Sequence, residues 1–233
     1  MLPSRRRLAA VAFVLCVATA GCADLDEQAQ GLTRNDLVAD LAAQMTAAAD
    51  LTYEASYQLP GGDKATVAQT RKPARTAYVY PGGKVTVTAD AITECRTAKT
   101  TTCTMTAPAT AASPPPAKVF EVASETGLVT PATVQALLNA AVLDADVEVE
   151  QHDTTIAGRH ATCVQLNGVD DAAARDFSTC ITNEGVLGSF NGILNRTRVE
   201  VAMTHYSEHV EEAMFEMPRA AKLVDRRAAR PSR

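Results

Sequence analysis

The sequence predicts an α+β layer fold in which a large antiparallel sheet packs against a few segregated helices. Apolar residues recur at helical spacing near the start and again in the middle of the chain, and each such region is followed by segments that alternate apolar and polar residues. Most of these segments are separated by tight turns, which require antiparallel pairing. The expected order is one helix, about six strands, two helices and five or six further strands.

The start of the chain has the layout of an export signal. Residues 5–7 are three arginines, residues 8–21 form an uncharged and mostly apolar run, and small residues lead directly into Cys22. This run is shorter than the roughly twenty residues that a membrane-spanning helix needs. The pattern resembles the lipobox of bacterial lipoproteins, which implies cleavage before Cys22 and attachment of a lipid such as palmitate to its thiol.

The alternative is an ordinary secretory signal that is cut after Ala18 or Ala20. With the lipobox interpretation, the signal peptide covers residues 1–21 and a polar tether without periodicity covers 22–31. We then expect a single domain over 32–224, a flexible basic tail over 225–233, and a location at the outer face of the plasma membrane.

Charge and cysteine content agree with this view. Removing residues 1–21 deletes three arginines and no acid from 22 basic and 27 acidic residues, so 19 and 27 remain and the formal charge is −8. Nucleic acid is therefore not an expected partner. Four further cysteines in an exported chain suggest two disulfides, with three possible connectivities. We favour Cys95–Cys103 and Cys163–Cys180, because both pairs are local and can lie across neighbouring strands.

The first half of the domain is expected to form one helix and six strands. Thr33 or Asn35 can cap a helix that runs to about Ala49. Between Leu51 and Leu59 every odd residue is apolar and every even one polar, which is typical of a half-buried strand. The further strands are expected at 64–72, 77–80, 84–88, 91–95 and 101–106.

The second half begins with a loop over 107–117 that is rich in proline, alanine, serine and threonine. A short helix is expected over 117–125, and Thr130-Pro131 predicts the start of a second one. Strands follow at 146–156, 159–167, 176–182, 186–191 and 197–206, and residues 215–218 close the sheet region.

This element order resembles the LolA-like superfamily, including the LppX/LprG-type lipoproteins of actinobacteria. The matching pieces are the leading helix with Leu37 and Leu41, the Leu51–Leu59 strand, the helix pair in mid-chain, the hairpin at 155–159 and the closing segment at 215–218. The resemblance implies a strongly curved antiparallel sheet, an open half-barrel of about 10–12 strands, with helices packed over its concave face.

The resemblance also implies a lipid or glycolipid ligand, bound in a cavity between sheet and helices for local hand-off or presentation at the cell envelope. The expected lining consists of Tyr53, Tyr57, Val134, Leu138, Val147, Val149, Ile181, Val199 and Val201. The alternative is that these residues fill an ordinary core. A chain with a filled core would be an envelope scaffold or sensor lipoprotein that binds a protein partner.

No catalytic, metal or cofactor site is expected, so the chain is not predicted to be an enzyme. Ser189 lies between glycines but lacks the spacing of a Gly-x-Ser-x-Gly nucleophile elbow. His205 and His209 have the spacing of a helical zinc pair, but no glutamate follows the first histidine and the segment is predicted to end a strand.

Overall fold

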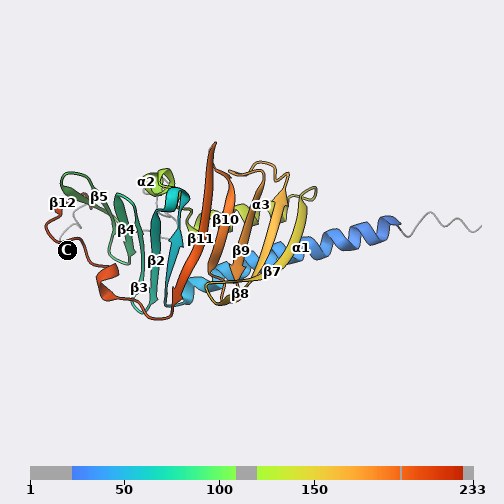
Figure 1. Ribbon diagram of the computed structural model, residues 1–233, viewed down its shortest axis with the longest axis horizontal. Coiled ribbons are helices and arrows are strands. Elements are labelled where there is room, and N and C mark those ends of the chain that lie inside the picture. The colour runs from blue at the N-terminus through green and yellow to red at the C-terminus, as the bar shows by residue number, and fades with distance from the viewer. Residues whose placement is uncertain (1–22, 109–119, 195, 228–233) are drawn as a thin grey trace, which may run out of the picture.

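A curved, open sheet of twelve strands forms the main layer of the part of the chain that the structure, a computed structural model, describes: residues 23–108, 120–194 and 196–227, with side chains from Arg34 onward (Figure 1). The strand order is β12-β6-β5-β4-β3-β2-β1-β11-β10-β9-β8-β7. Three helices complete the described elements, so the α+β class and the open, mostly antiparallel sheet are as predicted.

The strands are β1 (Tyr53–Gln58), β2 (Lys64–Arg71), β3 (Ala74–Tyr80), β4 (Gly83–Thr88), β5 (Ile92–Thr97), β6 (Thr101–Thr106), β7 (Glu148–Ile156), β8 (Arg159–Asn167), β9 (Phe177–Thr182), β10 (Leu187–Leu194), β11 (Thr197–Ser207) and β12 (Lys222–Asp225). The helices are α1 (Ala23–Ala47), α2 (Glu121–Glu125) and α3 (Pro131–Leu143), and short 3₁₀ turns lie at Ala48–Asp50, Pro60–Gly62 and Glu212–Met214.

Helix α1 begins earlier than the sequence pattern indicated. It starts at Ala23, so residues 23–31, which the pattern placed before the helix, are helical. Their role as a tether stays a prediction. The physical reason for the earlier start is composition, because alanine, leucine, glutamate and glutamine favour a helix even without an apolar stripe. Acidic residues near the N-terminus also suit the helix dipole. Cys22 and the expected signal peptide lie outside the described residues.

Helix α3 agrees with its predicted start. Thr130 is the N-cap, its Oγ1 accepts from the backbone N–H of Thr133 at 3.2 Å, and Pro131 occupies the first helical position. Helix α2 covers only Glu121–Glu125 of the helix expected over 117–125, and residues 117–119 of that prediction lie outside the described part. Of the predicted loop over 107–117, only 107–108 are described.

The sheet consists of two antiparallel meanders joined in the middle. Strands β1 to β6 are neighbours in chain order, and so are β7 to β11. The two meanders meet where β1 pairs with β11, with Glu54 opposite Ser207 and Gln58 opposite Ala202. This long-range pairing was not predicted, because alternation within a strand does not reveal its partner.

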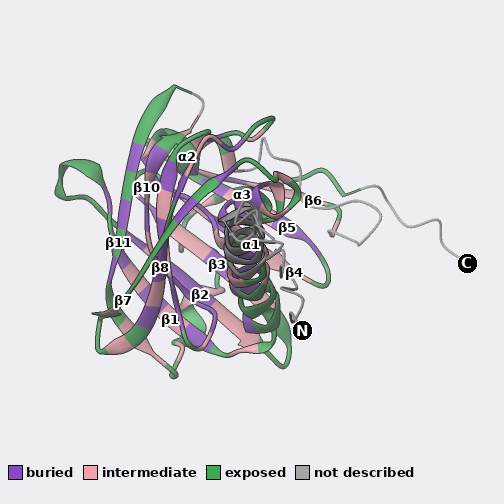
Figure 2. Cartoon of the chain, turned by 90° about the vertical axis from the view of Figure 1, so that its right-hand side faces the viewer, coloured by how far each residue is buried: buried purple, intermediate pink, exposed green. Residues whose placement is uncertain are grey.

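Helices α1 and α3 pack against each other and against one face of the sheet (Figure 2). The apolar stripe of α1 contributes Val38, Leu41 and Met45 to the core, and α3 contributes its own buried side chains on the facing side. Strand residues such as those of β1, which alternate buried and half-buried, complete the same cluster. One continuous core therefore holds the helices on the sheet.

Both predicted disulfides are confirmed. Cys95 lies directly opposite Cys103 in the β5–β6 pair, and Cys163 directly opposite Cys180 in the β8–β9 pair. Each therefore joins two adjacent strands, one in each meander.

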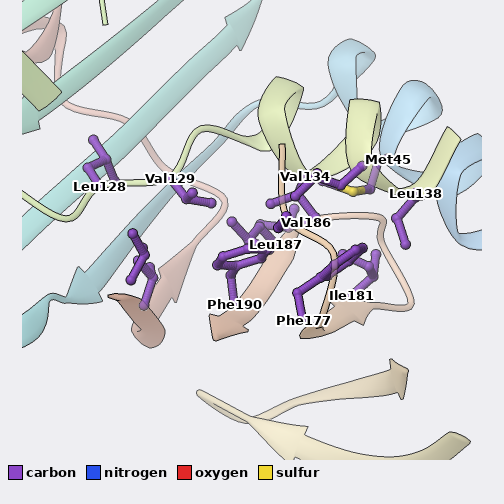
Figure 3. Packing of buried hydrophobic residues seen from close by; sticks show 14 of the residues in the cluster. Met45, Leu128, Val129, Val134, Leu138, Phe177, Ile181, Val186, Leu187 and Phe190 are labelled. Atoms are coloured by element: carbon purple, nitrogen blue, oxygen red, sulfur yellow. The ribbon is translucent and has the colours of Figure 1, made fainter. Parts of the chain in front are cut away.

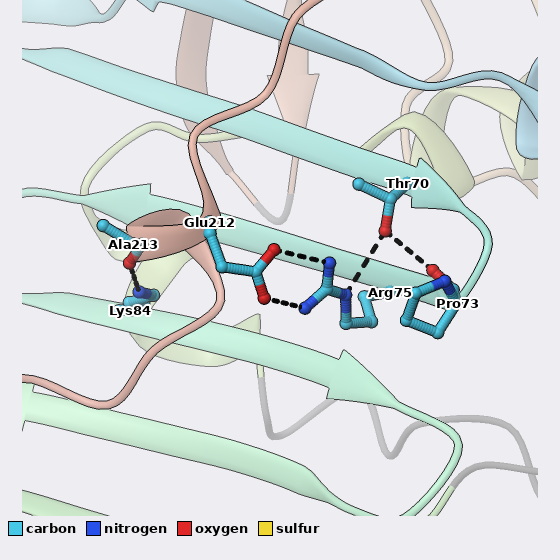
Figure 4. Close-up of polar contacts among 6 residues, drawn as sticks. All are labelled: Thr70, Pro73, Arg75, Lys84, Glu212 and Ala213. Carbon is cyan, nitrogen blue, oxygen red and sulfur yellow. Dashed lines mark hydrogen bonds and ion pairs between the residues drawn. The ribbon is translucent and has the colours of Figure 1, made fainter.

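The C-terminal segment differs from the prediction. Residues 208–221 cross β3 and β4 on the face opposite Tyr80 and Val85, and β12 then pairs in parallel with β6 (Figure 4). Glu212 forms an ion pair with Arg75, whose guanidinium also lies 4.2 Å from the ring centre of Phe215. The Nζ of Lys84 donates to the carbonyl of Glu216 at 2.7 Å.

Asp225, the first residue of the expected tail over 225–233, therefore lies in a strand, and the expectation of antiparallel pairing is wrong at this edge. The flexibility of the tail stays a prediction. The reason for the parallel pairing is that the chain crosses the sheet before pairing, so β12 enters in the same direction as β6. Asp225 is the last residue of β12, and the backbone N–H of Arg226 donates to the carbonyl of Met105 at 2.7 Å.

Candidate functional site

The candidate site is an apolar groove lined by residues of α2 and of the adjoining ends of β10 and β11. Figure 1 labels these three elements. The volume of the groove is about 660 Å³, within the range typical of small-molecule sites. Helix α2, the connection from α2 to α3, the first turn of α3 and the loop before β9 form the rest of its wall. Its lining residues are Phe120, Glu121, Ser124, Glu125, Leu128, Val129, Thr133, Ala173, Leu194, Thr197 and Val199.

The floor of the groove is positioned by the turn that ends α2. Gly127 has a φ of +87°, its N–H donates to the Ser124 carbonyl, and the N–H of Leu128 donates to the Ala123 carbonyl, each at 3.0 Å. These two bonds form a Schellman motif, which favours glycine at this position. A Cβ on Gly127 would also lie 2.8 Å from Cδ of Pro60. The motif turns Leu128 inward, where it is almost fully buried.

Phe120 joins the groove to the sheet. Its ring meets the ring of Tyr78 on β3 edge to face, with 5.1 Å between centroids and 80° between planes. The hydroxyl of Ser124, one turn along, donates to the Phe120 carbonyl at 2.9 Å. The first turn of α2 is therefore anchored to β3 by an aromatic contact and closed by a side-chain hydrogen bond.

Two carboxylates lie on the rim. Glu121 and Glu125 are one helical turn apart on α2, and both are exposed. On β5, Nε of Arg96 lies 2.7 Å from Oε1 of Glu94. This pairing raises the pKa of Arg96, and the nearby charge of Glu121 adds to the rise. The guanidinium that senses the charge of Glu121 is thus already paired with Glu94.

The nine residues expected to line a cavity all lie in the hydrophobic core, and of these only Val199 also lines the groove. Figure 3 shows Val134 and Leu138 of α3 above Ile181 and Phe177 of β9, with Leu128 and Val129 at the other side of the cluster. Packing of the other eight against neighbouring side chains is the role that the alternative interpretation gave them. A contact of theirs with a ligand stays a prediction.

The two tyrosines on β1, Tyr53 and Tyr57, pack in the hydrophobic core. The Tyr57 hydroxyl donates to the Leu187 carbonyl of β10 at 2.9 Å, across the join between the two meanders. The Tyr53 ring stacks with Tyr206 at 6.0 Å between centroids. Burial raises the pKa of both phenols well above the usual value for tyrosine, so both stay neutral at physiological pH.

Sequence reasoning missed four large apolar residues of the groove, Phe120, Leu128, Val129 and Leu194, and the small Ala173. A usable signal existed for two of them. Leu128 and Val129 form an apolar pair directly after a glycine and before a capped helix, in a connection that would ordinarily be polar. Phe120 is the N-cap of α2 and Leu194 is the last residue of β10, and at such ends the apolar period does not predict which way a side chain points.

Other site classes find little support in the described residues. Across 23–108, 120–194 and 196–227, no helix has the length and apolarity required to cross a bilayer. Within the same ranges, no three of the histidine, cysteine, aspartate and glutamate side chains come together as a metal site would require. His205 lies on β11 and His209 beyond its end, where Nε2 of His209 is 3.5 Å from Glu211.

Comparison with known proteins yields only distant structural likenesses. No protein-family model and no curated protein matches the chain. An uncharacterized conserved protein from Thermus thermophilus superposes with a TM-score of 0.48 and 8% identity, covering 80% of this chain and 98% of that one. MucB superposes with a TM-score of 0.48 and 10% identity, covering 80% of this chain and 65% of MucB. Because both scores lie below 0.5, neither likeness identifies a family or a function.

Proposed function

We propose that this chain is an exported lipoprotein, held at the outer face of the plasma membrane through Cys22, that binds an apolar ligand such as an acyl chain for local hand-off or presentation. The observation that carries the ligand proposal is the groove of about 660 Å³ with its floor of Leu128 and Val129. Each methylene that moves from water into such a groove contributes about 0.8 kcal/mol. The anchor proposal rests on the sequence around Cys22, and the resemblance to LolA-like lipoproteins supports both.

In this proposal the helices lie over the concave face of a half-barrel, and the groove is the opening between helix layer and sheet. Helices α1 and α3 fill one part of that space with packed side chains. The part next to α2 is where an apolar ligand finds room without displacing the core. Binding needs no enzymatic group, cofactor or metal.

The ligand proposal is tested with a matched pair of variants on β10. Leu194 lines the groove, whereas its neighbour Ile193 is 60% exposed and does not. We expect Leu194→Gln to weaken binding of a fluorescent acyl probe by about 1–2 kcal/mol, roughly fivefold to thirtyfold. Ile193→Gln should bind like the parent chain. Mass spectrometry of native lipid extracts would identify the natural ligand. Absence of both extracted lipid and probe uptake would contradict the proposal.

The anchor proposal is tested by Cys22→Ala. The variant should leave the membrane fraction and enter the medium as a folded domain, because the acyl chains that hold it would be missing. Retention in the membrane without this thiol would contradict the lipoprotein interpretation and leave the groove proposal untouched.

A protein partner is the second candidate function, for an envelope scaffold or sensor. The observation in its favour is a set of large apolar side chains that are exposed in the described residues: Leu143 at 88%, Ile193 at 60%, Leu223 at 44% and Met217 at 42%. They belong to different elements, namely α3, β10, β12 and the segment before β12. Crosslinking from Leu143 in whole cells, with a non-binding result for the acyl probe, would favour this candidate.

A further inference from the structure

We propose that the groove discriminates between apolar ligands by the charge of their polar end, accepting neutral hydroxyl-bearing or cationic ends and disfavouring anionic ones such as a free fatty acid. This inference rests on the proposed function, because it presupposes that an apolar chain occupies the groove. It adds the chemical class of the ligand.

The groove combines an apolar wall with two acidic side chains. Phe120, Leu128 and Val199 surround the space that an alkyl chain would fill, and the polar end of the chain would then lie at the rim beside α2. Both charged side chains that line the groove, Glu121 and Glu125, are on that rim and both are negative. A negative end placed there would meet two like charges at close range.

None of the described residues that line the groove is a cation that could offset these charges. The charge of Glu121 acts on Arg96, but Nε of Arg96 already lies 2.7 Å from Oε1 of Glu94. Arg196 is exposed in the turn between β10 and β11 and is not among the residues that line the groove. The described groups Glu94, Arg96, Glu121 and Glu125 together therefore carry a formal charge of −2.

Hydrogen bonding at the rim also favours a ligand end that donates hydrogen bonds. Ionised carboxylates only accept hydrogen bonds. Two of the rim hydroxyls are already engaged, because Ser124 donates to the Phe120 carbonyl and Thr133 lies 2.9 Å from the Thr130 hydroxyl. The rim therefore offers acceptors, which match a ligand end that supplies O–H or N–H donors. An ionised carboxylate end supplies none.

The experiment compares three probes of equal alkyl length: a monoacylglycerol, a fatty acid and an alkyltrimethylammonium. Binding is measured at low and at physiological salt with the full chain carrying Cys22→Ala, so that no covalently attached acyl chain competes for the groove. We expect the fatty acid to bind roughly fivefold to tenfold more weakly than the neutral probe at low salt. The difference should shrink as salt screens the rim.

Variants assign the effect to the rim. Glu121→Gln/Glu125→Gln should bring the fatty acid to the affinity of the neutral probe. The matched control is Glu148→Gln/Glu150→Gln, which removes the same charge from exposed positions on β7, away from the groove, and should leave the preference intact. Arg196→Gln should also leave it intact.

The outcomes separate this inference from the function on which it rests. If no probe binds, the proposed function itself fails. If all three probes bind and the fatty acid is not disfavoured, or if the control variant changes the preference as much as the rim variant does, the charge discrimination fails while apolar binding stands.

Discussion

At two tyrosines of the same core, loss of the side-chain hydroxyl should change the stability of the fold in opposite directions. The Tyr57 hydroxyl is buried and donates to the Leu187 carbonyl at 2.9 Å. The Tyr80 hydroxyl is also buried, but none of the described residues offers it a hydrogen-bond partner. Substitution by phenylalanine keeps the ring in both cases and removes only the hydroxyl, so the comparison isolates the hydrogen bond.

The magnitudes follow from this difference. Tyr57→Phe breaks a buried hydrogen bond and leaves the Leu187 carbonyl without that donor, which costs about 1–2 kcal/mol. For a domain of this size that corresponds to a fall in Tm of roughly 2–8 °C. Tyr80→Phe removes a buried polar group that has no partner, and relief of its desolvation should raise stability by up to about 2 kcal/mol.

The assay is urea denaturation of both variants and the parent chain with disulfides intact, followed by circular dichroism. Equal slopes of the transitions would show that the midpoints report stability alone. A loss of stability in Tyr80→Phe as large as that in Tyr57→Phe would refute the reasoning. So would a Tyr57→Phe chain as stable as the parent.

Three further perturbations test the architecture. Gly127→Ala should destabilise the fold by about 1–2 kcal/mol or more, because a left-handed φ and the close Pro60 both oppose a side chain. Gly158→Ala is the control, because Gly158 has a similar φ but open space around it. A smaller loss of stability in thermal unfolding of Gly158→Ala would isolate the clash with Pro60. Replacing Cys163 and Cys180 by alanine should cost roughly 3 kcal/mol, and an unchanged denaturation midpoint would contradict this. Burial raises the pKa of Tyr80 to about 12, so the folded state holds this proton more tightly than the unfolded chain. The contribution of this bound proton to folding stability is complete below about pH 10 and is lost as the pH rises through about 12. Alkaline denaturation followed by tyrosinate absorbance should therefore show a smaller loss of stability in Tyr80→Phe than in the parent chain.

Local features of the fold could be predicted from the sequence, and long-range ones could not. The β8 strand, the cap at Thr130 and both disulfides depend on residues close in sequence, where spacing determines geometry. The pairing of β1 with β11 depends on the curvature of the whole sheet, which no single segment records. The parallel position of β12 depends on the path of the preceding residues across β3 and β4.

The candidate site shows the same division. Alternation correctly indicated which side chains of β1 and β11 face inward, but an inward direction does not distinguish a packed position from one that borders a groove. Val199 and Val201 both face inward on β11 and are both buried, but only Val199 lines the groove. That distinction depends on how α2 and its Schellman turn lie relative to β11, which the spacing of residues in the sequence does not record.

The join between β1 and β11 also has a consequence for the order of folding. Each meander can form by local hairpins, but the middle of the sheet must wait for residues such as Ser56 and Thr204, whose hydrogen bond spans 148 positions of sequence. Until then β1 and β11 are both open edges, able to pair with the wrong chain. An inner seam of the finished sheet thus closes after the hairpins on either side of it, and during that interval the chain is exposed to aggregation.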